Sequence, residues 1–260
     1  MNAAKEKEVG APGGARVTLA GKSHSGTLSP ALDPVLARRD VWRGREPHAT
    51  TPTVASGRRV LDAALPGGGW PLGALTEICS AQAGLGELSL MLPALVRLAA
   101  PDRWLGFVAP PYPLYAPALA QAGLPLARCL VVTPQKNAPW AAEQLLRGGA
   151  CAAVLLWSDE DDAQVLRRLQ LAAEAGGALA VLYRPLQAAQ RVSPAALRLR
   201  LGADRRAEVF KCRGTTWHAE RGLRFNLSSP CGNGFSLDWA YRAQSALLQS
   251  RLCRSALCAR

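Results

Sequence analysis

The chain has 260 residues and a mass of 27.5 kDa, enough for one large domain with tails. Hydrophobic residues make up 49% and charged residues 19%, which excludes wholesale disorder and allows a sizeable core. With 31 Lys and Arg against 19 Asp and Glu, the formal net charge is +12. Such an excess favours a polyanionic or acidic partner, such as nucleic acid or an acidic protein face.

Apolar runs and cysteines indicate the compartment. The longest apolar runs are only as long as strands, and the first residues lack the pattern of a secretory signal. The seven cysteines are scattered, without a CxxC pair. The sequence therefore predicts a cytoplasmic protein with buried thiols, no metal site, no disulfide framework and no membrane contact.

The N-terminal part of the chain has the composition of a tail. Residues 1–33 are rich in Gly, Ala, Ser and Pro and show no apolar periodicity, which predicts a flexible segment. Residues 34–53 are predicted as a short helix followed by a linker, because Pro34 suits a first helical turn and apolar residues follow it.

Residues 54–230 alternate between short aliphatic runs and Ala/Leu-rich stretches of helical length. Uniformly apolar strands separated by helices predict a mostly parallel sheet covered on both faces, an α/β core. The predicted strands span residues 74–79, 104–108, 129–132, 152–157 and 178–183. The predicted helices span residues 86–99, 112–122, 138–147 and 160–175. Three further runs, 196–201, 208–212 and 223–227, have no helix between them and predict an antiparallel extension at the sheet edge.

The last segment, residues 231–260, is a basic tail with apolar residues at helical spacing. Two interpretations remain open. The helix docks on its own domain, or it binds a partner protein. The residues that would contact a partner are Trp239, Tyr241, Leu247, Leu248 and Leu252.

Residues 77–90 have the layout of a P-loop, in which an apolar strand enters a Gly-containing turn and then a helix. When the motif is aligned on Gly86, Ala81 replaces its first glycine, Glu87 its lysine and Leu88 its hydroxyl residue. Glu87 repels triphosphate, and Leu88 cannot bind magnesium. Loss of these groups predicts that the turn binds no nucleotide.

Two glycines and one tryptophan complete this prediction. Gly84 and Gly86 are expected only to make a tight strand-to-helix turn. Trp157 occupies the place of the second ATPase acid, at the end of the fourth apolar strand. The acids at 159–162 suit a helix start, although a displaced metal-binding acid is the alternative. We therefore expect no catalytic residue, no cofactor and no enzymatic activity.

Several segments resemble the RecA-like recombinase family over residues 54–227. They are Ser56–Leu65, Gly68–Gly73, Glu77–Ile78 and Tyr115–Leu124. The chain departs from that family at Ala109–Tyr112, which lacks the acid that activates water, and at Gln187–Val192, which is shorter than the DNA-gripping loop of recombinases. Within this superfamily the chain resembles the ImuA family of translesion-synthesis accessory proteins. That resemblance rests on residues 41–44, 65–71, 84–90 and 178–185.

The resemblance implies a RecA-like core that acts as a non-catalytic scaffold in SOS-induced, error-prone DNA synthesis. It implies binding to an ImuB-type polymerase-like protein and an error-prone replicative-type polymerase, with the RecA recombinase and single-stranded DNA as further partners. Two alternatives stay open: a SulA-like inhibitor of cell division that targets the division GTPase, and a divergent DNA-dependent ATPase.

Basic residues on the last predicted strands support a contact with DNA. The candidates are Lys211, Arg213, Trp217, Arg221 and Arg224. Basic residues interleaved with an aromatic can hold a single strand. They can equally form a charged edge that prevents strand-to-strand aggregation.

Overall fold

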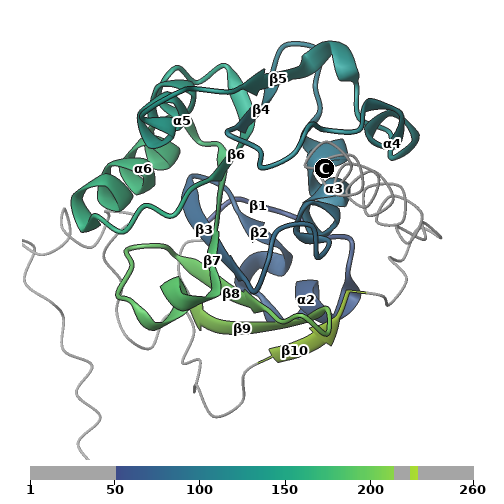
Figure 1. Cartoon of the computed structure of the whole chain (residues 1–260). Coiled ribbons are helices and arrows are strands. Elements are labelled where there is room, and N and C mark those ends of the chain that lie inside the picture. The colour runs from purple at the N-terminus through teal and green to yellow at the C-terminus, as the bar shows by residue number, and fades with distance from the viewer. Residues whose placement is uncertain (1–50, 214–222, 228–260) are drawn as a thin grey trace, which may run out of the picture. The chain divides into compact units, whose positions relative to one another are not determined.

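An eight-stranded sheet organises the computed structural model, which describes residues 51–213 and 223–227 (Figure 1). The strands lie in the order β10-β9-β8-β3-β7-β6-β4-β5. All eight were predicted, each within two residues of its observed ends. Their bounds are β3 (Ala74–Ser80), β4 (Trp104–Val108), β5 (Cys129–Val132), β6 (Cys151–Trp157), β7 (Leu179–Pro185), β8 (Leu197–Leu201), β9 (Arg206–Cys212) and β10 (Leu223–Asn226).

Four predicted helices are present. They are α3 (Glu87–Leu98), α4 (Ala116–Gln121), α5 (Ala138–Arg147) and α6 (Ala163–Gly176). Helix α4 begins four residues later than expected, because Tyr115 before it is extended. Three short elements were not predicted: α2 (Arg59–Ala64) and the paired strands β1 (Thr53–Val54) and β2 (Trp70–Pro71). Turns of 3-10 helix lie at Pro66–Gly68, Leu126–Arg128 and Leu186–Gln190 (η4).

The sheet is covered on two faces, as its apolar strands predict. One apolar cluster packs residues of α2, α3 and α4 against one face, and another packs α5 and α6 against the other (Figure 1). Every residue of β3 is buried, as expected for a central strand between two layers of helices. Because β3, β4 and β6 run in the same direction in this sheet, their carboxyl ends lie at the same edge.

The antiparallel extension begins one strand later than predicted. Strand β8 pairs in parallel with β3, and the antiparallel pairs of this sheet are β8 with β9 and β9 with β10. The prediction assumed that a connection without an α-helix returns as a hairpin. Instead, the segment after β7 crosses over β3 through η4, and β8 joins the far side of β3.

Several predicted features lie outside the described residues. They are the N-terminal tail, the helix at 34–43, the tail at 231–260 with its five partner-binding candidates, and Trp217 and Arg221. Among the residues that are described, no helix combines the length and the hydropathy needed to cross a membrane. Within the same ranges, no three His, Cys, Asp or Glu side chains are grouped so that they could hold a metal ion.

Candidate functional site

The turn between β3 and α3 is the strand-to-helix turn that the sequence predicts. Gly84 and Gly86 have φ angles of 86° and 101°, in the left-handed region that strains any residue with a Cβ atom. Gly86 is the N-cap of α3, which begins at Glu87. The two glycines therefore allow the tight turn of the backbone, and the N–H groups of Gly84 and Gly86 point toward one carboxylate.

That carboxylate belongs to Glu87. Its Oε1 accepts a hydrogen bond from the Gly84 N–H at 2.8 Å, and its Oε2 accepts one from the Gly86 N–H at 3.1 Å. The residue is only 5% exposed. In phosphate-binding loops, such converging N–H groups hold the ligand's oxygens. Here the chain supplies the anion itself, so Glu87 fills the turn as well as repelling triphosphate.

A pair of stacked aromatic rings on β6 and β7 contacts the turn between β3 and α3. The rings of Trp157 and Tyr183, which face each other on β6 and β7, stack with centroids 4.6 Å apart and planes 21° apart. The Tyr183 hydroxyl donates to the Glu87 carbonyl oxygen at 3.2 Å. The pKa of Tyr183 is raised well above its ordinary value, mainly by burial and secondly by the negative charge of Glu87. The phenol therefore remains a donor. The place expected for an acid thus holds an apolar stack.

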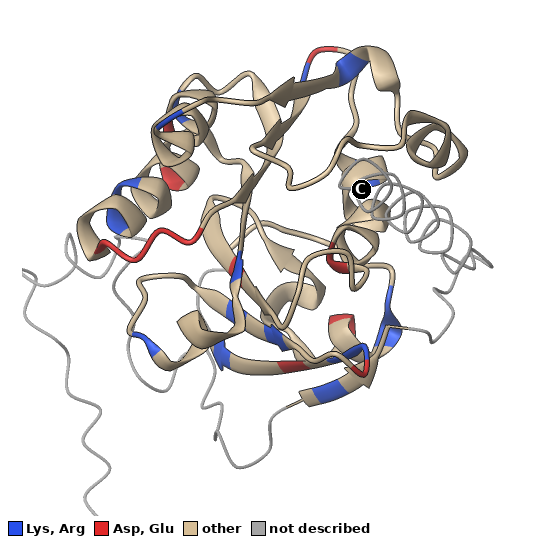
Figure 2. Ribbon diagram, in the orientation of Figure 1, with Lys and Arg blue, Asp and Glu red and all other residues tan. Residues whose placement is uncertain are grey.

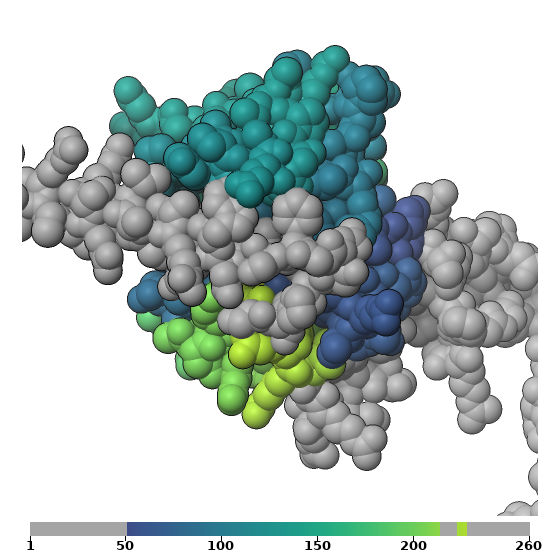
Figure 3. Space-filling model, turned by 90° about the vertical axis from the view of Figure 1, so that its right-hand side faces the viewer, coloured from purple at the N-terminus to yellow at the C-terminus, as the bar shows by residue number. Residues whose placement is uncertain are grey.

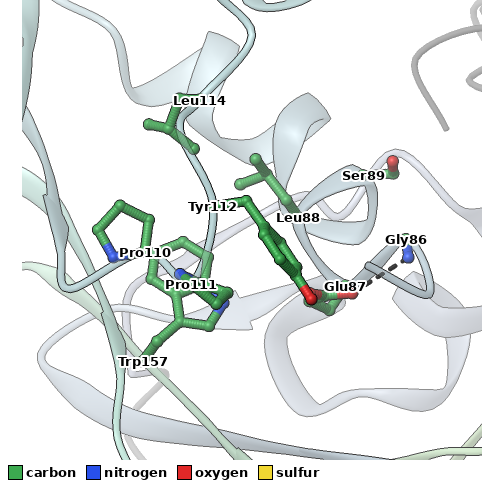
Figure 4. Close-up of a pocket in the computed structure, with 9 residues that line it drawn as sticks. All are labelled: Gly86, Glu87, Leu88, Ser89, Pro110, Pro111, Tyr112, Leu114 and Trp157. Atoms are coloured by element: carbon green, nitrogen blue, oxygen red, sulfur yellow. Dashed lines mark hydrogen bonds between the residues drawn. The ribbon is translucent and has the colours of Figure 1, made fainter. Parts of the chain in front are cut away.

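A pocket lies over this turn, where the carboxyl ends of β3, β4 and β6 meet (Figure 4). Ligands of open α/β sheets usually bind at such a place. Its lining comes from the start of α3, the loop after β4 and the end of β6: Gly86, Glu87, Leu88, Ser89, Pro110, Pro111, Tyr112, Leu114 and Trp157. The prolines have no N–H to offer, and the lining's one carboxylate is already bonded to the turn. The lining thus offers a triphosphate no basic side chain.

The acids after β6 cap α6, as the first of the two interpretations predicts. Asp162 is the N-cap, and its side chain accepts from the Gln164 N–H at 2.7 Å. Glu160 Oε1 accepts from the N–H groups of Asp161 and Asp162 at 2.9 and 2.8 Å. These bonds stabilise the helix start, where N–H groups lack partners within the helix.

A buried ionic cluster in the middle of the sheet was not predicted. Glu77 of β3 is fully buried between Arg184 of β7 and Arg198 of β8. Its Oε2 lies 2.8 Å from Arg198 Nε and 3.6 Å from Arg184 Nη1, and Ser193 donates to its Oε1. Asp161 forms ion pairs with both Arg184 and Arg191. The sequence did contain a signal for this cluster. Glu77 is a lone acid inside an apolar run, Arg184 lies near the end of a later apolar strand, and arginines alternate with leucines in β8.

This cluster ties the crossover segment to the sheet. The guanidinium of Arg198 donates to the carbonyl oxygens of Ala188 and Arg191, each at 2.8 Å. The pKa of the Cys79 thiol is raised to about 11, mainly by burial and secondly by the negative charge of Glu77. The Cys79 thiol is thus kept protonated and is a poor nucleophile.

The basic candidates separate into two groups. Lys211 donates to the Ser193 carbonyl at 2.6 Å, and Arg213 to the Pro194 carbonyl at 3.3 Å, so both hold the crossover segment. Burial, followed by the charges of Arg198 and Arg213, lowers the pKa of Lys211. Arg224, by contrast, has a side chain that is 75% exposed on the edge strand β10.

The comparisons with known proteins find similarity to SulA over part of the chain. A family model described as cell division inhibitor SulA matches residues 73–180, from just before β3 into β7. The crystal structure of SulA from Pseudomonas aeruginosa is 29% identical over 42% of this chain and 97% of that chain, with a TM-score of 0.36. No curated protein sequence matches the chain. The matched stretch contains the glutamate-filled turn and ends before β8, β9 and β10.

Proposed function

We propose that the protein is a non-catalytic adaptor of the DNA-damage response, built on a RecA-like core and acting in error-prone translesion synthesis. The observation that carries the non-catalytic part is the bonding of Glu87 to Gly84 and Gly86, which occupies the phosphate position of the fold. The neighbouring acid position holds Trp157. The replacement of those groups supports a role in binding other macromolecules.

Two findings support the damage-response context. The family model of SulA matches residues 73–180, which relates the core to a family associated with the SOS response. The resemblance to the ImuA family at residues 84–90 covers the same turn. We propose an ImuB-type polymerase-like protein and an error-prone replicative-type polymerase as partners in the cytoplasm, with the RecA recombinase as a further one.

Inhibition of cell division is the second candidate function, and the SulA family match favours it. The two candidates name different partners, so a pull-down of the tagged chain from damaged cells separates them. Recovery of the polymerase-like protein supports the adaptor. Recovery of the division GTPase without polymerase subunits contradicts the adaptor and supports the second candidate.

The purified protein is expected to bind no Mg-ATP at physiological concentrations. Glu87 fills the phosphate position, and positions 87 and 88 carry neither the lysine nor the hydroxyl residue of the motif. Isothermal calorimetry checks this, and a micromolar dissociation constant would refute it. The double substitution Glu87→Lys and Leu88→Thr is expected to remain without hydrolysis, because Trp157 and Pro110–Pro111 still supply no acid.

Removal of residues 235–260 is expected to leave the core folded and to abolish binding to the polymerase-like partner. The removed segment carries apolar residues at helical spacing together with several arginines, which suits an acidic partner surface. Thermal melting and a pull-down are measured side by side. A truncated protein that cannot fold would show that the segment belongs to the core, and full binding would place the interface elsewhere.

A further inference from the structure

Strands β8, β9 and β10 carry basic residues that the candidate site does not use (Figure 2), and the yellow part of the described chain, where β10 lies, is at the surface in Figure 3. Residues 197–213 hold six basic side chains and two acidic ones. Strand alternation sorts them. Leu197, Leu199 and Leu201 of β8 pack into the core, as do Ala207 and Val209 of β9. The residues between them point away from that core.

Two arginines on this face are largely exposed, and a third is about half exposed. The exposed fractions of their side chains are 44% for Arg200, 72% for Arg206 and 75% for Arg224. Arg200 and Arg224 lie on either side of Glu208 in the strand register, about 10 Å apart across three strands. Arg206 stands two residues from Glu208 along β9, about 7 Å away. We call Arg200, Arg206 and Arg224 the arginine triangle.

The acids nearby do not neutralise the arginine triangle. One carboxylate, Glu208, serves both Arg200 at 3.8 Å and Arg224 at 3.4 Å, and Asp204 lies 3.6 Å from Arg206. Exposed ion pairs of this kind contribute little, typically about 0–1 kcal/mol. A phosphate that offers two oxygens to a guanidinium can therefore replace them.

One of these arginines is held in place by an aromatic ring. The Arg200 guanidinium lies 4.6 Å from the centre of the Phe210 ring, and the buried Arg198 lies 4.9 Å from it. Strand alternation places Phe210 on this face, at the register shift between β8 and β9 and beside Arg198 and Arg200. The stacking limits the conformations of Arg200 before a ligand arrives, which lowers the entropy lost on binding.

We propose that the arginine triangle binds the sugar-phosphate backbone of single-stranded nucleic acid. The charge complementarity is direct, since the ligand carries one negative charge per nucleotide and the triangle an excess of positive charge. The shape favours a single strand, because exposed side chains on neighbouring strands can line an extended chain, whereas duplex grooves admit a helix or a two-stranded ribbon. This inference assigns a defined surface to the contact with single-stranded DNA that the sequence led us to expect, and the adaptor role itself requires only protein partners.

The test is fluorescence anisotropy of the full chain with labelled oligo(dT) over a range of salt concentrations. Each phosphate contact on a single strand contributes about 0.7 to the magnitude of the slope of log K against log salt. At 0.1 M salt one contact therefore raises the affinity about fivefold relative to 1 M salt. The triple variant Arg200→Gln, Arg206→Gln, Arg224→Gln is expected to lose about 100-fold in affinity and about 2 in slope. Glu208→Gln is expected to bind about fivefold more tightly.

A matched control comes from α5 and α6. There Arg147 and Arg168 share Glu143, each at 3.3 Å, in the same two-to-one arrangement. The control Arg147→Gln, Arg167→Gln, Arg168→Gln removes the same net charge and is expected to change affinity less than threefold. The proposal is overturned if the wild type does not bind oligo(dT), if both triple variants lose affinity equally, or if duplex DNA competes as well as the single strand.

Discussion

Replacing Glu87 with alanine is expected to open the β3–α3 turn to an inorganic anion. The substitution removes the acceptor of the Gly84 and Gly86 N–H groups and leaves their geometry, which the two left-handed glycines determine. In buffer without such anions, the unpaired donors are expected to cost about 1–3 kcal/mol of stability. Pyrophosphate should restore part of this, by about 1.4 kcal/mol at ten times its dissociation constant.

The surroundings of the turn also favour an anion once the carboxylate is gone. The turn lies at the N-terminus of α3, where the helix dipole favours negative charge. The Arg205 guanidinium lies 3.8 Å from where a Cβ atom on Gly86 would be. The measurement is the melting temperature of Glu87→Ala with and without pyrophosphate. The wild type should show no shift, because its turn is filled.

Glu160→Ala is the matched control for this prediction. Glu160 also accepts two backbone N–H bonds at a helix start, but Asp161 and Asp162 carry charge at the same place. An anion is expected to be repelled there, so pyrophosphate should not stabilise this variant. If both variants respond alike, the effect is nonspecific. If Glu87→Ala does not respond, the turn is not a retained anion site.

The sheet was predictable because its apolar runs are short, uniform and bounded by turn residues. Strand β5 was placed from Cys129–Val132 alone, with its observed ends. Patterns within one segment do not reveal which strands become neighbours. The parallel pairing of β8 with β3 depends on a crossover whose helix, η4, is too short to leave a periodic pattern.

The sequence predicted which ATPase residues the candidate site lacks, but it did not predict the contacts that the replacing residues make. The sequence shows that Glu87 and Trp157 stand where a lysine and an acid would be. Three-dimensional contact is needed to show that Glu87 bonds to Gly84 and Gly86 and that Trp157 stacks on Tyr183. The sequence likewise could not separate Arg224, which is exposed, from Lys211, which bonds to a neighbouring loop.

The buried cluster around Glu77 carries the largest expected effect on stability. Arg184 and Arg198 have side chains that are 1% and 5% exposed, and Glu77 lies between them on the central strand. Without the carboxylate, two guanidinium groups would face each other in the core with only Asp161 nearby. Desolvated charges of one sign are costly, because the protein interior screens them far less than water does.

Glu77→Ala is therefore expected to lower the free energy of unfolding by about 3–5 kcal/mol, a large part of the stability of a typical domain. Glu77→Gln keeps the shape without the charge, so a smaller loss of stability, still above about 1 kcal/mol, is expected.

Thr76→Val is the matched control. Thr76 is fully buried beside Glu77, and its hydroxyl has no hydrogen-bond partner among the described residues. Urea unfolding should show Thr76→Val as stable as the wild type or slightly more so. Equal stability of Glu77→Ala and Thr76→Val would show that the cluster does not hold the sheet together.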